Sequence, residues 1–231
     1  MSTMKRSQIN TIIRQSEAFM RDFGYILPPF AGWSPEEMVA RKAEIAGITG
    51  AGLGWDITDF GLGDFASKGL FLFTTRNGRV GDLKRGRGML YAEKAMISRK
   101  DQVTPMHRHD LKAEDIINRG GGTLVIELFG DTDGHCDREK GVTVATDGVV
   151  QTFEPGHRLR LAPGESVTLM PGDWHAFWAE EADVFVAEVS TVNDDAIDNI
   201  FEDPLVSRFS GIEEDEHPVH LLVSDYGTWL R

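Results

Sequence analysis

Apolar residues recur near the start of the chain at the spacing of one helix face. Between Arg6 and about Tyr25, most steps from one apolar residue to the next are three or four positions, the period of an amphipathic helix. The apolar residues of this stripe are Ile9, Ile12, Ile13, Phe19, Met20 and Phe23. We expect a helix whose apolar stripe packs on a larger body.

A second helix is predicted from its start signal. Ser34 offers an N-cap hydroxyl, Pro35 suits the first helical position, and the glutamates that follow can close a capping box. We expect this helix to run to about Ala46.

Beyond Gly47 the pattern changes to short runs of β-branched, aliphatic and aromatic residues. Gly, Asn-Gly and Pro-Gly turn signals separate them. The runs cover residues 70–75, 90–97, 123–128, 142–145, 149–153, 158–161, 166–170 and 184–190. Regular short strands of this kind predict a sandwich or a barrel. A last apolar stretch, residues 219–223, predicts one more edge strand.

The length and the even composition favour a single domain. A chain of 231 residues can bury a full core, and neither a linker of biased composition nor a fixed-period repeat divides it. We expect a mostly β domain with N-terminal helices in residues 1–48, a barrel core at about 70–191 and a C-terminal extension at 192–231.

Charge and hydropathy narrow the choice of partners. The net charge of −13 and the scattered Lys and Arg residues argue against nucleic acid as a partner. No apolar run approaches the 18 residues of a membrane span, and the N-terminus lacks a secretory signal, so we expect a cytoplasmic protein without membrane contact. The single cysteine, Cys136, lies in a polar stretch and is assigned no role.

A group of histidines indicates a metal site. His107 and His109 are two positions apart, so in an extended segment both imidazoles lie on one face. Glu114 follows His109 by five residues, so a short turn could bring its carboxylate back to the two imidazoles. His175 lies some sixty residues further along the chain, just after the Pro-Gly turn at residues 171–172, and could supply a third imidazole. Three imidazoles and a carboxylate suit Mn²⁺, Fe²⁺, Co²⁺, Ni²⁺ or Zn²⁺ and leave positions for a ligand on a six-coordinate ion.

These motifs resemble those of a known superfamily. His107-x-His109-x4-Glu114 followed by Gly120 to Gly122 is similar to the first cupin motif, and the segment from Gly164 to His175 resembles the second. The sequence departs from the second cupin motif at two places: Pro171 adjoins Gly172 directly, and Ala179 replaces an asparagine. Neither change affects a predicted metal ligand. The resemblance implies a jelly-roll β-barrel of the cupin type.

Longer matches resemble one cupin branch, the D-lyxose isomerases. They cover residues 88–94, 107–115, 171–178, 188–195, 208–209 and 212–216. This resemblance implies interconversion of D-lyxose with D-xylulose, and of D-mannose with D-fructose, with Mn²⁺ as the metal. It also implies a small-molecule sugar as substrate and a homodimer.

Isomerisation of a sugar requires a metal and a proton-transfer group. A divalent ion that chelates the carbonyl and the adjacent hydroxyl polarises the carbonyl and stabilises a cis-enediolate, while a base moves the proton from C2 to C1. Lys94 and Glu188 are candidates because both lie in predicted strands, although an edge lysine and a salt-bridged structural carboxylate are the alternative interpretations. Glu213 and Glu214 lie in a matched stretch but belong to an acidic run, so they rank below Glu188.

Two other functions fit a three-histidine cupin site. An Fe²⁺ dioxygenase would use the same ligands to bind O₂, and a non-catalytic cupin would bind a sugar without converting it. The acidic charge and the absence of an evident DNA-binding helix pair argue against a sugar-binding regulator.

Overall fold

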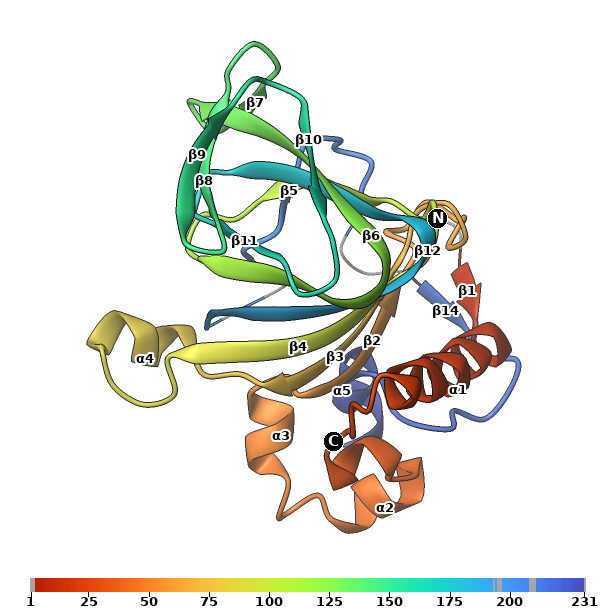
Figure 1. Ribbon diagram of the computed structural model, residues 1–231. Helices are drawn as coiled ribbons and strands as arrows, with labels where there is room; N and C mark the ends of the chain where they lie inside the picture. The colour runs from red at the N-terminus through yellow and green to blue at the C-terminus, as the bar shows by residue number, and fades with distance from the viewer. Residues whose placement is uncertain (1–2, 193, 195–196, 208–210, 231) are drawn as a thin grey trace.

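The computed structural model describes residues 3–192, 194, 197–207 and 211–230. Figure 1 shows a barrel of antiparallel strands with most of the helices gathered on one outer side. Hydrogen-bonded neighbours in the main sheet follow the order β2-β3-β4-β12-β6-β11-β8-β9. The bounds of these strands are β2 Gly54–Thr58, β3 Leu70–Arg76, β4 Tyr91–Ser98, β6 Glu114–Thr132, β8 Val142–Thr146, β9 Val149–Phe153, β11 Ser166–Leu169 and β12 Trp174–Thr191.

Four shorter strands attach to this path. β10 (His157–Leu161) and β7 (His135–Asp137) pair with β6, while β5 (Thr104–Arg108) pairs with β12 and with β13 (Ile200–Phe201). The mostly β class and the N-terminal helical extension are therefore confirmed.

Two long strands close the barrel. β6 has 19 residues and β12 has 18, and each pairs with different neighbours along its two halves. β12 pairs with β4 from Val184 onward and with β5 near His175. Only residues 123–128 and 184–190 of these strands were predicted, because the glycines at 120–122 and the glutamates at 180–181 interrupt the apolar pattern.

The bend in β6 depends on a glycine. Gly121 has φ of +103°, and a Cβ there would lie 2.0 Å from the carbonyl oxygen of Asp183. The register between β6 and β12 shifts between Glu180 and Val184, beside this close approach. A residue without a side chain therefore lets the two strands approach closely and stay paired through the shift in register.

Alternate residues of the strands fill two apolar clusters. Leu70 and Leu72 of β3 face the barrel interior, whereas Phe71 and Phe73 face outward and pack with the apolar stripe of α1 (Arg6–Asp22). This second cluster confirms the predicted amphipathic helix and explains why β3 is buried on both faces.

The second predicted helix is shorter than expected. α2 (Pro35–Ala40) begins with the predicted capping box at Ser34, but it ends six residues before Ala46. Residues 39–44 are all exposed, so no buried face supports further turns. A separate short helix, α3, covers Ala46–Gly50.

The C-terminal prediction was wrong. Residues 219–223 form no strand: Leu222 makes one isolated bridge with Trp55, and the chain then enters η2 (Val223–Asp225) and α5 (Tyr226–Trp229). The Asp225 carboxylate accepts the N–H of Leu222 at 2.8 Å and so closes a turn in place of an extended strand.

The sequence pattern did not predict several short elements. They include η1 (Pro29–Gly32), α4 (Val80–Arg85), which projects from the body in Figure 1, the two-stranded parallel sheet of β1 (Thr3–Lys5) and β14 (Gly211–Glu213), and the strands β2, β7 and β13. Among the helices of the described ranges, none is long and apolar enough to cross a membrane.

Candidate metal centre

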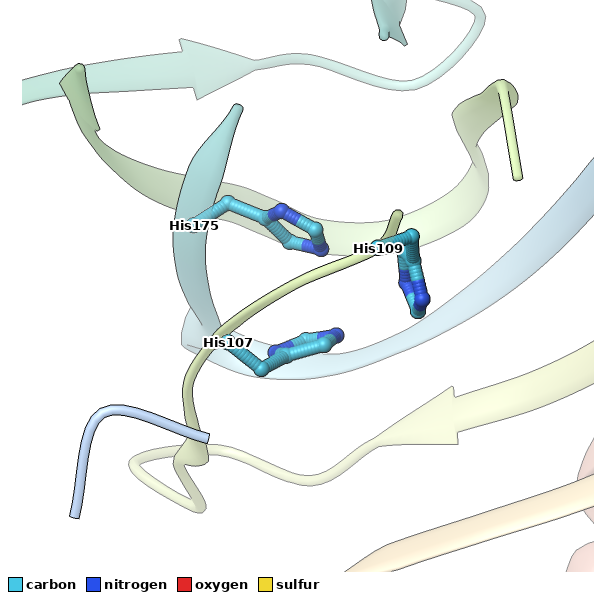
Figure 2. Close-up of side chains that lie close together, drawn as sticks. All are labelled: His107, His109 and His175. Carbon is cyan, nitrogen blue, oxygen red and sulfur yellow. The ribbon is translucent and has the colours of Figure 1, made fainter. Parts of the chain in front are cut away.

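Strand pairing brings the three predicted histidines together (Figure 2). His107 of β5 lies directly opposite His175 of β12 in the antiparallel register, and their ring centroids are 4.2 Å apart. His109 follows just after β5, with its ring 5.2 Å from that of His107. One ring nitrogen of each histidine lies within 4.8 Å of the other two, and all three residues are buried. This geometry is suitable for a metal ion.

Backbone carbonyls orient the three imidazoles. The Nδ1 atoms of His107, His109 and His175 contact the carbonyl oxygens of Pro105, Asp198 and Asp173 at 2.8, 2.6 and 3.0 Å. A carbonyl only accepts hydrogen bonds, so each Nδ1 donates its proton to the carbonyl and Nε2 is left to face the cluster. Burial and the neighbouring His175 and His109 also hold the pKa of His107 well below its ordinary value. Nε2 is thus the atom that each histidine would offer to a metal.

Glu114, the first residue of β6, brings a carboxylate to the same point. Its Oε1 atom lies 3.2 Å from Nε2 of His175 and 3.4 Å from Nε2 of His109. Burial raises the pKa of this carboxyl, but the Lys112 ammonium and His109 more than offset that effect and hold the pKa well below its usual range. The carboxylate is therefore an anion despite its burial.

These atoms lie close enough together to share one cation. Within the described ranges, Nε2 of His109, Nε2 of His175 and Oε1 of Glu114 are buried atoms that form no hydrogen bond. Buried polar atoms that have no hydrogen-bond partner are costly in a protein interior. A divalent ion would satisfy all three, so the residues present fit a bound metal.

A second buried group of charges lies beside the histidines. Glu188 of β12 lies opposite Lys94 of β4 in the strand register, and its Oε1 is 3.3 Å from Nζ of Lys94. The ammonium of Lys112 lies 3.1 Å from the same oxygen and 2.5 Å from Oε2 of Glu114. Glu188 is 4% exposed and Lys94 is 2% exposed. The structure therefore brings two of the four candidate catalytic residues to the histidine cluster.

Except for His109, these side chains line one cavity that is partly open to solvent. His107, His175, Glu114, Glu188 and the two lysines belong to its polar lining. Its apolar part comes from strands, from the turn after β2 and from β13: Phe60, Leu70, Leu72, Met96, Ile116, Phe177 and Phe201. A ligand with a polar reacting end and less polar contacts elsewhere suits such a cavity.

Sequence reasoning missed Lys112, Asn199 and Phe201, which also line this cavity. Lys112 had a usable signal, because it lies two positions before Glu114 and could share its face. Asn199 and Phe201 belong to the irregular C-terminal segment, where no pattern indicated contact with the barrel.

Glu213 and Glu214 lie apart from the cavity. Glu213 of β14 is 3.9 Å from the ammonium of Lys5, and Glu214 forms an ion pair with Arg6 at 2.6 Å. Both side chains are 55% exposed, and neither lines the cavity. Among the stretches that resemble the isomerases, Asn193, Asp195 and residues 208–209 lie outside the described residues.

Solved structures identify the class of barrel. The L-ribose isomerase of Acinetobacter sp. DL28, in complex with L-ribose, aligns with 92% of this chain and 99% of its own, with a TM-score of 0.62 and 14% sequence identity. The ligand-free L-ribose isomerase of Cellulomonas parahominis aligns over the same shares with a TM-score of 0.58 and 16% identity. The chain thus has the fold of the cupin-type isomerases, with a buried three-histidine cluster inside its barrel.

Sequence comparisons identify the family. The profile of the D-lyxose isomerase family matches residues 4–226. A D-lyxose/D-mannose isomerase of Serratia proteamaculans is 51% identical over 229 residues, which are 96% of this chain and 98% of the relative; that of Escherichia coli O157:H7 is 45% identical with the same coverage. The chain belongs to the D-lyxose isomerase family. It is therefore a sugar isomerase, which is an intramolecular oxidoreductase.

Proposed function

We propose that this protein interconverts D-lyxose with D-xylulose, and D-mannose with D-fructose, with a divalent metal held by His107, His109, Glu114 and His175. The observation that carries the proposal is the set of buried atoms without a hydrogen-bond partner on His109, His175 and Glu114, which lies beside the ion-paired carboxylate of Glu188. The names of the relatives from Serratia proteamaculans and Escherichia coli O157:H7 support the choice of sugars.

The donor set limits the choice of metal. Three imidazole nitrogens and one carboxylate oxygen suit Mn²⁺, Fe²⁺, Co²⁺, Ni²⁺ or Zn²⁺, and the family resemblance favours Mn²⁺. When bound, such an ion supplies Lewis-acid polarisation of the sugar carbonyl.

Glu188 is the proposed proton-transfer group. Conversion of an aldose to a ketose removes a proton from C2, returns one to C1 and shifts one from the C2 hydroxyl to the C1 oxygen. A carboxylate that accepts the C2 proton and delivers it to C1 is unchanged at the end, as a catalyst must be. Glu188 is the cavity carboxylate that remains for this task when Glu114 holds the metal.

Lys94 and Lys112 assist in this scheme. Both ammonium groups contact Glu188 and face the cavity. They hold the carboxylate in place and can donate hydrogen bonds to the sugar oxygens on which charge develops. Lys112 also contacts Glu114, so it ties the proposed proton-transfer group to the proposed ligand set.

Metal removal and return tests the proposal. The purified protein would be stripped with EDTA, supplied with single divalent metals, and assayed for ketose formation from D-lyxose, D-mannose, D-xylose and D-glucose. We expect conversion of D-lyxose and D-mannose, with the highest rate in Mn²⁺. No conversion with any metal would refute the isomerase, and oxygen uptake by the iron-loaded protein would favour the dioxygenase alternative.

Assembly and location stay predictions. A homodimer is expected from the family resemblance alone, and light scattering during size-exclusion chromatography measures it directly. The cytoplasmic location is likewise a prediction, which fractionation of cells that express the natural gene would test.

A further inference from the structure

One buried carboxylate holds the turn that joins His109 to Glu114. The backbone N–H groups of Asp110, Leu111 and Lys112 all donate to the side chain of Asp198, at 2.9, 3.0 and 3.0 Å. Oδ1 accepts the first two and Oδ2 accepts the third. Asp198 is 3% exposed and lies 86 to 88 residues further along the chain than the groups it binds.

The main chain of Asp198 reaches the histidine cluster as well. Its carbonyl oxygen accepts the Nδ1–H of His109 at 2.6 Å, the shortest of the three imidazole–carbonyl contacts. Its own N–H donates to the carbonyl of Asp194 at 3.0 Å, which anchors the residue in its segment. The same residue therefore orients the imidazole of His109 and fixes the backbone from which Lys112 projects.

A carboxylate is well suited to this task. Three N–H groups from successive residues converge on it, and its two oxygens offer about four acceptor positions. An asparagine would keep the size but replace one oxygen with an NH₂ group, which is a donor and would face a backbone N–H. Asparagine would therefore leave at least one of these N–H groups without an acceptor and alanine would leave all three, among them the buried N–H of Lys112, so the turn would have to move.

We propose that Asp198 is a positioning residue for this centre, acting through His109 and Lys112. It sets the tautomer and the direction of one ligand and the place of the lysine that contacts both Glu114 and Glu188. This inference rests on the proposed function, because it assumes that His109 binds the metal. Asp198 itself does not line the cavity and is not expected to touch the sugar.

The test compares Asp198→Asn and Asp198→Ala with a matched control. Asp203 lies in the same C-terminal segment and its carboxylate also accepts a backbone N–H, that of Leu205 at 2.9 Å, but it is exposed. Asp203→Asn is therefore the control for loss of a backbone-capping carboxylate. For each protein, Mn²⁺ binding to the metal-free form is titrated by electron paramagnetic resonance, and kcat, KM and Tm are measured at saturating Mn²⁺.

We expect the Asp198 variants to bind Mn²⁺ about 10- to 100-fold more weakly, as is usual when the partner that orients a ligand is lost. At saturating Mn²⁺, kcat should fall more than KM changes, because Lys112 is displaced while the cavity walls remain. Asp203→Asn should match the wild type in both. A lower Tm with unchanged Mn²⁺ affinity and unchanged kcat would reduce Asp198 to a structural residue and overturn the proposal.

Two further measurements separate the possible failures. If the wild-type protein binds none of Mn²⁺, Fe²⁺, Co²⁺, Ni²⁺ and Zn²⁺, the proposed function fails, whatever Asp198 does. If neither variant folds, amide hydrogen exchange of the wild-type protein tests the proposal instead. The N–H groups of Asp110, Leu111 and Lys112 should exchange slowly. Fast exchange of all three in the metal-loaded protein would contradict the proposal.

Discussion

At the scale of single residues, Glu188 illustrates how one side chain combines two interpretations. Sequence reasoning left open whether it was a proton-transfer base or a salt-bridged structural carboxylate. It is buried and paired with Lys94 and Lys112, yet it lines the same cavity as the histidines. The ion pairs therefore do not exclude catalysis, since they hold the carboxylate in the cavity in which a sugar would react.

Replacing Glu188 with glutamine tests this assignment. Glutamine keeps the shape but cannot accept a proton, so we expect kcat to fall by about 10²- to 10⁴-fold. Metal content should stay at the wild-type level, as measured by inductively coupled plasma mass spectrometry. Glu213→Gln, which removes a carboxylate paired with Lys5 at the surface, should leave kcat unchanged. The reverse pattern would move the proton-transfer role to Glu213.

Loss of His175 should remove the metal. His175→Ala deletes one of the nitrogens that lie within 4.8 Å of each other, and we expect Mn²⁺ affinity to fall by more than about 100-fold, since losing only a partner that orients a ligand costs up to that much. Isothermal titration of the metal-free protein measures the change. His135→Ala, at an exposed histidine on β7, serves as control. Full metal content in His175→Ala would show that the ligand set is wrong.

The residues of the centre that sequence could predict are those with a local signal. His107 and His109 share a face because they are two apart, and His175 follows a recognisable turn. The position of Asp198 depends on contacts with residues 86 to 89 positions earlier. No local pattern encodes such a contact, because it arises only when the segment after β12 returns across β5.

At the scale of elements, the strands were predicted where apolar residues form a regular pattern. They were missed where glycines or charged residues interrupt that pattern but the strand continues. β6 continues through Gly120, Gly121 and Gly122 because glycine permits a bend that brings β6 and β12 into close contact. The same glycines act as a turn signal in a sequence. Whether they end a strand or bend it depends on the partner strand, which local sequence does not reveal.

Gly121→Ala should destabilise the protein. A Cβ at this position would lie 2.0 Å from the carbonyl oxygen of Asp183, and φ is +103°. We expect the free energy of unfolding to fall by at least about 1–3 kcal/mol, the usual cost of such a backbone conformation in other residues. The control is Gly47→Ala, whose Cβ would meet nothing within 4 Å in α3; it should be neutral or stabilising by about 0.4–1 kcal/mol. Urea unfolding of the metal-free proteins distinguishes them, and equal stabilities would contradict the expectation.

At the scale of the whole molecule, an ionic cluster joins the beginning of the described chain to its last part. Arg6 is fully buried and donates to both Glu214 and Asp225, while β1 pairs with β14. Asn10 of α1 adds bonds to the backbone of His217 and Val219. The helix that covers the outer face of β3 is thus held in place by residues more than two hundred positions away.

This cluster should weaken in acid. The hydrogen bond from Arg6 lowers the pKa of the Glu214 carboxyl below its ordinary 4.5. A group with a lowered folded-state pKa stabilises the fold above its unfolded value and loses that contribution as pH falls through the folded one. Glu214→Gln should therefore lower stability at pH 7 and lose less stability than the wild type between pH 5 and about 3. Urea unfolding midpoints measured across this pH range test the prediction, with Glu216→Gln as control. If the stability of Glu214→Gln depended on pH as steeply as that of the wild type and of the control, the prediction would be contradicted.

The docking of α1 also sets an order of events during synthesis. The residues that anchor the helix leave the ribosome 208 positions after Arg6, so the apolar stripe of α1 and the outward-facing Phe71 and Phe73 are all made long before the anchor exists. Until then the nascent chain exposes two apolar surfaces that pack together in the folded protein, and the ion pairs that hold α1 in place cannot yet form. A chain stalled before residue 211 should therefore recruit chaperones that bind exposed apolar segments, even though every strand of the main barrel sheet has already been made.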